Sequence, residues 1–155
     1  MGTQQIYLIV LAVIIVGIAT GVAFTIFMNH QYYSNRQNMA SEMATFAPAV
    51  LKYWNTSRLL AGADANMNRL SIAGVAGYIG FNIVKVINGV TTYSTKDDNG
   101  EFRVTAISTT DSTVTIQGLG SEKRNGKHPF LTSTISLKKH PTTKTVLVMS
   151  DATGW

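Results

Sequence analysis

The sequence predicts an α+β protein in which one long N-terminal helix packs under a small antiparallel meander sheet. Two observations lead to this fold class. Residues 6–28 contain no charge, and the first charged side chain of the chain is Arg36. After Gly100, apolar and polar residues alternate with the period of two that is typical of half-buried strands. The 155 residues leave room for one compact domain besides the helix.

The apolar stretch from Ile6 to Met28 organises the chain. A helix of these 23 residues spans roughly 35 Å, and about 20 apolar residues suffice to cross a bilayer core. Because the stretch is hydrophobic on every side, its partner must be lipid or other copies of the same helix. No basic segment precedes it and it is longer than a typical signal-peptide core, so we expect it to be retained. Thr3 is the predicted helix N-cap.

Small residues recur within this stretch at helical spacing. Gly17 and Gly21 form one pair four residues apart, and Ala19 and Ala23 form a second. Such spacing lets helix backbones approach one another closely in an apolar medium, although glycines are also common in membrane helices in general.

From Asn29 the pattern changes to an amphipathic one, which predicts that the helix continues to about Trp54. Pro48 predicts a kink or a break. A helix of this length measures roughly 75 Å, more than the diameter of a domain of this size, so the apolar half must project. Asn35 falls on the predicted polar face. The predicted apolar stripe consists of Tyr32, Tyr33, Arg36, Met39, Ala40, Met43, Phe46, Ala47, Val50, Leu51 and Trp54. Within it, we assign the packing against the head to Met39, Met43, Phe46, Val50 and Trp54.

The predicted head follows the helix. Residues 55–80 read as a loop with one short helix over residues 65–73, and Asn88-Gly89 predicts a hairpin turn between strands at Ile83–Ile87 and Val90–Tyr93. Four further strands are predicted around residues 102–107, 113–119, 131–137 and 145–149, joined by short turns as a meander. On the first of these, Phe102, Val104 and Ala106 should share one face. That face should be covered by the helix stripe that contains Phe46, Val50 and Trp54, while the other face is solvated. The chain is thus divided into residues 1–28 (apolar helix), 29–54 (amphipathic continuation) and 55–155 (head).

The sequence predicts neither an enzyme nor a cofactor or metal site. The absence of cysteine excludes disulfides, thiol catalysis and cysteine-ligated zinc. The histidines His30, His128 and His140 are isolated, and the last two are expected in turns. No nucleotide-binding or hydrolase motif is present. Residues 64–68 imitate the start of a calcium loop, but Arg69 occupies the position that requires glycine.

Two basic runs flank predicted turns in the head, and together they form a candidate basic surface patch. In the predicted meander, both runs could lie at related ends of neighbouring strands. The patch could bind nucleic acid or an anionic surface, or its charges could only deter edge-to-edge pairing of strands. The residues of this candidate patch are Lys123, Arg124, Lys127, Lys138 and Lys139.

This layout, a charge-free half-helix continued by an amphipathic half under a small antiparallel sheet, resembles that of type IV pilins and type II secretion pseudopilins. The resemblance covers the whole chain in layout. In that family the apolar half-helices of many copies form the core of a filament, and the heads coat its outside. The family's glutamate near the start of the helix has no counterpart here, and Gln4 and Gln5 are the nearest polar residues.

The resemblance implies a structural subunit of a pilus-like extracellular filament at the cell surface. Its partners would be other copies of itself, the membrane before assembly and an assembly machinery, with nucleic acid as a minor alternative. Two other interpretations remain open: a single-pass membrane-anchored binding module, or an accessory pseudopilin of a secretion machine. A membrane-tethered enzyme would need a polar cluster that the sequence does not offer. The expected polymerisation core comprises Ile6, Leu8, Val10, Leu11, Ile14, Ile15, Gly17, Ile18, Gly21, Val22, Phe24 and Phe27.

Overall fold

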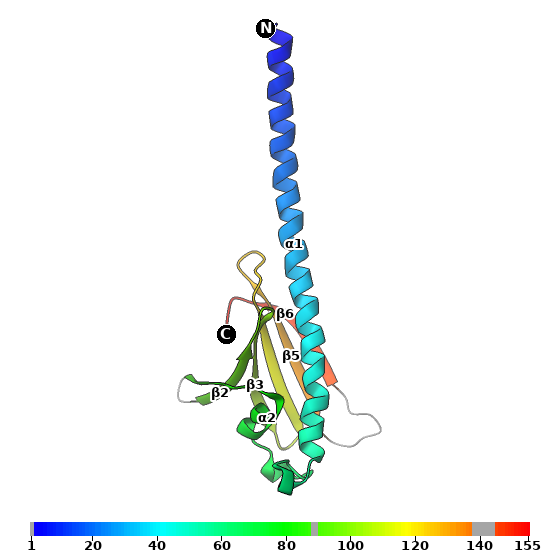
Figure 1. Ribbon diagram of the computed structural model, residues 1–155, viewed down its shortest axis with the longest axis vertical. Coiled ribbons are helices and arrows are strands. Elements are labelled where there is room, and N and C mark those ends of the chain that lie inside the picture. Colours follow the sequence, from blue (N-terminus) through cyan, green and yellow to red (C-terminus); the bar gives the residue numbers. More distant parts are fainter. Residues whose placement is uncertain (1, 88–89, 138–144) are drawn as a thin grey trace.

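The computed structural model describes residues 2–87, 90–137 and 145–155, and its architecture confirms the predicted α+β class. One long helix runs the length of the molecule, with its N-terminal half free and its C-terminal half against a sheet (Figure 1). The helical elements are α1 (Thr3–Asn55), the short 3-10 turns η1 (Arg58–Leu60) and η2 (Met67–Arg69), and α2 (Ile72–Ile79). The strands are β1 (Ile83–Ile87), β2 (Val90–Lys96), β3 (Gly100–Ser108), β4 (Thr113–Gly120), β5 (His128–Ser136) and β6 (Thr145–Ala152).

Helix α1 differs from the prediction at its start and at its proline. Gly2 precedes the helix without any side-chain cap, and Thr3 is the first helical residue, so the predicted Thr3 cap is wrong. The helix continues through Pro48 to Asn55, so of the two outcomes predicted at the proline, a kink or a break, the break is wrong. A proline costs about 3 kcal/mol inside a helix. Burial of Ala47 and Val50 on either side of it offsets that cost, because both pack into the core of the head.

The buried face of α1 is centred differently from the predicted stripe. Tyr33 is 52% exposed, whereas Asn35, predicted on the polar face, is buried. At the end of the helix, Tyr53 is buried and Trp54 only partly so. The face of the helix that contacts the sheet is therefore rotated slightly about the helix axis from the face that the hydrophobic pattern predicts. Its buried residues are Tyr32, Asn35, Met39, Met43, Ala47, Val50 and Tyr53.

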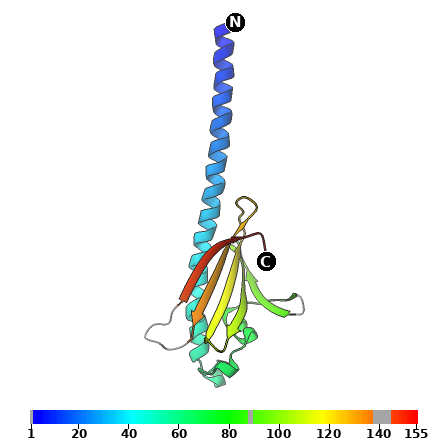
Figure 2. The ribbon, with the colours of Figure 1, turned by 180° about the vertical axis from the view of Figure 1, so that it is seen from behind.

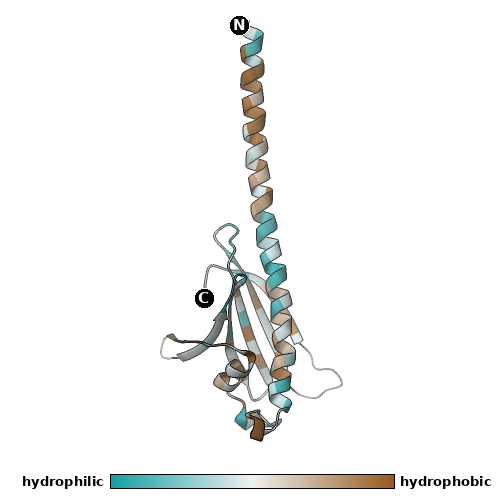
Figure 3. Cartoon of the chain, in the orientation of Figure 1, coloured by the Kyte–Doolittle hydropathy of each residue, from teal (hydrophilic) through white to brown (hydrophobic). Residues whose placement is uncertain are grey.

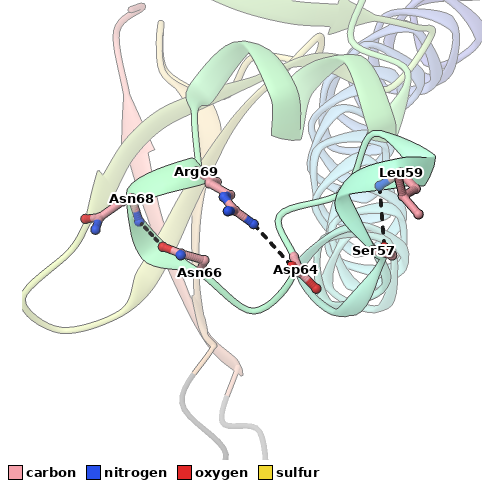
Figure 4. A network of polar contacts seen from close by, with 6 residues as sticks. All are labelled: Ser57, Leu59, Asp64, Asn66, Asn68 and Arg69. Carbon is pink, nitrogen blue, oxygen red and sulfur yellow. Dashed lines mark hydrogen bonds and ion pairs between the residues drawn. The ribbon is translucent and has the colours of Figure 1, made fainter.

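The segment after α1 forms two 3-10 turns before α2, instead of the single helix predicted over residues 65–73 (Figure 4). Two local side-chain caps start these turns: Ser57 Oγ accepts from the Leu59 amide at 3.4 Å, and Asn66 Oδ1 accepts from the Asn68 amide at 3.0 Å. The Asp64 carboxylate pairs with Arg69 at 3.1 Å. Asp64 is the first residue of the stretch that resembles the start of a calcium loop, and its carboxylate is engaged in this ion pair.

Helix α2 starts and ends with local signals that the glycine-rich sequence concealed. The Ser71 hydroxyl caps its N-terminus by accepting from the Gly74 amide at 3.0 Å. Gly80 ends the helix in the left-handed region, at φ 88°, where glycine is favoured. Val75 and Ala76 face the core, so α2 covers the part of the sheet that α1 leaves open.

The sheet is a single antiparallel meander in the order β1-β2-β3-β4-β5-β6. Its six strands correct the predicted four-strand sheet, because the strands of the predicted hairpin extend the same sheet through pairing of β2 with β3. The turn predicted at Asn88-Gly89 lies outside the described residues. His128 is the first residue of β5 rather than part of a turn. His140 also lies outside the described residues.

One face of the sheet builds the core with α1 and α2, as the alternation predicted. Inward residues of β4 and β5 such as Val114, Ile116 and Ile135 are fully buried. On β3 the predicted alternation holds only to Val104, because the register shifts by one residue before Ala106. This β-bulge turns Ile107 toward the core and leaves Ala106 exposed, which corrects the predicted placement of Ala106.

Candidate functional site: the projecting apolar helix

The free half of α1 exposes an apolar surface that a soluble domain does not carry. Every described side chain up to Met28 is exposed, and sixteen of them between Ile6 and Met28 are large hydrophobic groups. Figure 3 shows this half as a nearly continuous hydrophobic column that gives way to mixed colours beside the sheet. Burying such side chains fully is worth about 1.5–3 kcal/mol each. Half of that, over sixteen residues, is about 12–24 kcal/mol. This is as large as, or larger than, the ~5–15 kcal/mol that holds a domain folded. This surface therefore requires an apolar partner.

The two pairs of small residues in this half lie on opposite faces of the helix. Since successive residues are about 100° apart around the axis, Gly17 and Ala19 are separated by about 200°. Gly17 and Gly21 share one face, and Ala19 and Ala23 share the other. A Cβ added at Gly17 or Gly21 would meet no atom within 4 Å, so no contact within the chain requires these glycines. Two faces can therefore accept a closely packed neighbouring helix.

The two threonine hydroxyls in this half are hydrogen-bonded within the helix itself. The Thr20 hydroxyl donates to the Val16 carbonyl at 2.8 Å, and the Thr25 hydroxyl donates to the Gly21 carbonyl at 3.0 Å. Hydroxyl groups bonded in this way can enter an apolar environment without leaving an unsatisfied donor. From Ile6 to Met28 the apolar half of α1 thus carries no charge, and both of its threonine hydroxyls are bonded within the helix; Tyr7 carries the remaining hydroxyl.

The residues that we assigned to the polymerisation core all lie on this free half, and their large side chains are exposed on every side of it. The residues assigned to packing against the head divide into two groups. Met39, Met43 and Val50 are fully buried, while Phe46 and Trp54 are partly buried and pack against the core. Phe46 also makes edge-to-face contacts with Phe81 and Phe102, at centroid distances of 5.1 and 5.4 Å.

Two glycines of β4 make room for the packed half of α1. A Cβ at Gly118 would lie 2.8 Å from the ring of Phe102 and 3.1 Å from Met39 Cε. A Cβ at Gly120 would lie 2.4 Å from Asn35 Oδ1 and 2.5 Å from Pro129 Cγ. We did not predict this pair from the sequence. The signal was present, since a glycine replaces an apolar residue at two successive inward positions of a strand.

A polar contact joins α1 to the turn between β2 and β3, and we call it the helix–turn contact. It consists of Asn35 and Glu42 on α1, Asp97 and Asn99 in the turn, and Ser121 after β4. The Asn35 amide donates to the Asn99 carbonyl at 2.7 Å and to Ser121 Oγ at 3.3 Å. Asp97 Oδ1 accepts from the Asn99 amide at 2.8 Å. These bonds fix the turn against the helix, although hydrophobicity alone placed Asn35 toward solvent.

Two carboxyl groups share a hydrogen bond in the helix–turn contact. Burial and the adjacent Asp97 carboxylate raise the pKa of Glu42 to about 7. The side-chain amide of Asn99, which donates to Glu42 Oε2 at 3.2 Å, acts to lower that pKa. Burial would also raise the pKa of Asp97, but hydrogen bonds from Glu42 and from the Gly100 and Asn99 amides outweigh it and lower that pKa. Protonated Glu42 therefore donates to ionised Asp97.

The first buried turn of α1 is fastened to one end of the sheet, at the end of β6 and at the β4–β5 hairpin. The Tyr32 hydroxyl donates to the Asp151 carboxylate of β6. Burial, together with this bond and the Asp151 charge, raises the pKa of Tyr32 to about 12. Arg124 donates to the Tyr33 hydroxyl at 2.5 Å, and its guanidinium carbon lies 4.8 Å from the centre of the Tyr32 ring. These contacts hold the junction between the free and packed halves of the helix.

On the outer face of the sheet, Trp155 packs beneath Arg103. The guanidinium carbon of Arg103 lies 3.6 Å from the Trp155 ring centre, and the Phe130 ring meets the Trp155 ring edge-to-face at 5.9 Å. On the inner face, Tyr32 binds Asp151 of β6. Side-chain contacts on both faces of the sheet therefore hold the C-terminal segment in place without a disulfide.

The structure describes only part of the predicted basic patch. Lys123, Arg124 and Lys127 belong to a tight hairpin between β4 and β5, in which Arg124 and Lys127 form a β-bridge. Lys138 and Lys139 lie outside the described residues, so their part of the patch stays a prediction.

No catalytic arrangement emerges from the described parts of the chain. Among residues 2–87, 90–137 and 145–155, no three side chains that could ligate a metal come together. A shallow polar depression of about 240 Å³ lies between α1, the β2–β3 turn and the start of the β4–β5 hairpin, lined by residues such as His30 and Glu122. No family model, curated protein or solved structure matches the chain. Arguments about function therefore rest on the geometry of α1 and the head.

Proposed function

We propose that this chain is a structural subunit of a pilus-like extracellular filament that polymerises through the apolar half of α1. The observation that supports it most strongly is the free half of α1, which is apolar on every side and offers two opposite small-residue faces. A polymer needs two different surfaces on each subunit, so that one copy binds the next without closing the assembly. A single helix with two close-packing faces meets this requirement.

The arrangement of the head supports the same proposal. The packed half of α1 is fixed to the sheet by the core, the helix–turn contact and the Tyr32–Asp151 bond. The outer face of the sheet carries half-exposed threonine and serine side chains along β4 and β5, such as Thr115, Thr132 and Thr134. The head is therefore suited to be a coat element, with hydroxyl side chains on the outer face of its sheet, attached to a helix that can enter a shared core.

Assembly would begin from a membrane-inserted precursor. With residues 6–28 in lipid, the apolar half is buried without any partner chain. Transfer from lipid into a bundle of identical helices changes hydrophobic burial little, so close packing of small residues must select the register. An assembly machinery would supply the work of extraction. The chain itself would act by self-association, with no catalytic step and no cofactor.

Electron microscopy of material sheared from expressing cells, combined with mass spectrometry of its protein bands, tests this function. We expect thin filaments whose main band is this chain. A chain that stays in the membrane fraction, with no filaments in the sheared material, would contradict the proposal. It would favour a single-pass anchored binding module or an accessory pseudopilin, and the stoichiometry of the detergent-solubilised complex would separate these two.

A further inference from the structure

The hairpin between β4 and β5 carries a local excess of positive charge. Residues 121–127 read Ser-Glu-Lys-Arg-Asn-Gly-Lys, which gives three basic side chains and one acidic. Lys123 and Lys127 are exposed, and neither makes an ion pair among the described residues. Glu122 is the opposing charge within the hairpin, and Asp98 of the β2–β3 turn lines the same polar depression as Glu122.

This hairpin has a defined shape. The Arg124 amide donates to the Lys127 carbonyl at 2.9 Å, and the Lys127 amide donates to the Arg124 carbonyl at 3.0 Å. Asn125 and Gly126 both have positive φ, at 53° and 74°, as a two-residue hairpin turn requires. The lysines are therefore presented by a fixed turn.

The hairpin lies beside the end of the apolar stretch. In both ribbon views it rises from the head along α1 toward the free half of the helix (Figures 1 and 2). Arg124 fixes its position by donating to Tyr33. Tyr33 follows Met28 by five residues, which is roughly 7.5 Å along the helix axis. The headgroup layer on each side of a bilayer core is about 5–8 Å thick.

We propose that the β4–β5 hairpin binds anionic phospholipid headgroups while the apolar half of α1 spans the membrane. This inference rests on the membrane-inserted precursor of the proposed function. When residues 6–28 fill the bilayer core, Lys123 and Lys127 lie at headgroup height and their charges face the lipid phosphates. Tyr33, half exposed beside them, is a residue type that favours this interface. The contact would hold the head upright on the membrane surface before extraction.

The full chain in lipid nanodiscs provides the test, with discs of phosphatidylcholine alone or mixed with phosphatidylglycerol. Because the chain has no cysteine, Asn125→Cys and Leu59→Cys each accept one nitroxide label. Leu59 is 94% exposed at the opposite end of the head. A nickel-chelating lipid headgroup then broadens the spectrum of a nearby label. We expect broadening at position 125 that increases with phosphatidylglycerol, and none at position 59.

Charge substitutions identify the groups responsible. The double variant Lys123→Gln with Lys127→Gln should abolish the increase in spectral broadening that phosphatidylglycerol causes for the label at position 125. Lys52→Gln with Arg58→Gln removes the same charge from exposed sites at the far end of α1 and should leave that increase unchanged. Hydrogen exchange of residues 121–127 in the unsubstituted chain gives a second measurement. We expect slower exchange in the anionic discs than in the neutral ones.

A label at Val13→Cys distinguishes failure of this inference from failure of the proposed function. Suppose that oxygen but not aqueous nickel reaches the label at position 13, and that the broadening at position 125 does not change with lipid composition. The helix then spans the bilayer, and only the hairpin contact is refuted. If aqueous nickel reaches position 13, both the membrane precursor and the hairpin contact are refuted. The labels at position 125 of two copies could also broaden each other's spectra, with no dependence on lipid composition. That result would assign the hairpin to contacts with a second copy and would refute the lipid proposal.

Discussion

Replacement of Glu42 by glutamine should remove a pH-dependent part of the stability of the head. The pKa of Glu42 is raised in the folded chain from 4.5 to about 7, first by burial and then by Asp97. Folding therefore favours the protonated form, and the associated stability is fully present below about pH 4.5 and is lost as the pH rises through about 7. The lowered pKa of Asp97 acts in the opposite sense, because its contribution is lost as the pH falls below about 4.

The size of the effect follows from the change in pKa. A change from 4.5 to about 7 corresponds to about 3 kcal/mol at 1.36 kcal/mol per pH unit. Because solvent reaches part of the Glu42 side chain, we expect a smaller loss of about 1–2 kcal/mol between about pH 5 and about pH 8. In Glu42→Gln, the amide can still donate to Asp97 and accept from Asn99, so the variant should keep its stability across this range.

Urea unfolding of the full chain in detergent micelles, followed by tryptophan fluorescence, measures this difference. Trp54 packs partly buried against the core and should report the loss of the head fold. Glu122→Gln is the matched control, since it removes a carboxylate outside the helix–turn contact, and it should keep the pH dependence of the unsubstituted chain. A Glu42→Gln variant that loses as much stability between pH 5 and 8 as the unsubstituted chain would refute the shared hydrogen bond.

Four further variants test other parts of the account. Gly17→Leu combined with Gly21→Leu should leave membrane insertion intact but prevent close helix packing, so that sheared preparations of the double variant contain few or no filaments. Gly120→Ala should lower the free energy of unfolding by about 1–3 kcal/mol, because its Cβ would lie 2.4 Å from a side-chain oxygen of α1. Gly77→Ala, in α2 with nothing within 4 Å, should be neutral or slightly stabilising in the same urea titration. Tyr32→Phe should cost about 1 kcal/mol by removing the bond to the β6 carboxylate, also measured by urea titration.

The long helix and the strands could be predicted because their signals are local. A run without charge from Ile6 to Met28 can only be an apolar helix at this length, and a head of about 100 residues is too small to enclose it. Likewise, Val114 and Ile116 alternate with threonine and glutamine residues and are buried as predicted. The Asn125-Gly126 turn follows from its two residues, both of which tolerate positive φ.

The features that sequence reasoning missed depend on partners distant in the chain. Asn35 is buried because the Asn99 carbonyl, 64 residues away, accepts its hydrogen bond. In the sequence, Gly120 is a residue type that weakens strands. Its role becomes clear only in the fold, where α1 crosses β4 at this position. The bulge before Ala106 could not be recognised, because Ala106 and Ile107 are both apolar and either could have faced the core. The candidate helix could thus be identified from sequence, whereas the contacts that orient the head on it could not.

The most direct test of self-association through α1 is a helical reconstruction, by cryo-electron microscopy, of filaments sheared from expressing cells. The account predicts that residues 6–28 of many copies bundle along the filament axis, with the heads outside. Within that bundle, the face of Gly17 and Gly21 on one copy should lie against a neighbouring helix, and the face of Ala19 and Ala23 against another. A filament whose subunits contact one another only through their heads, with the apolar helices separated, would contradict the account.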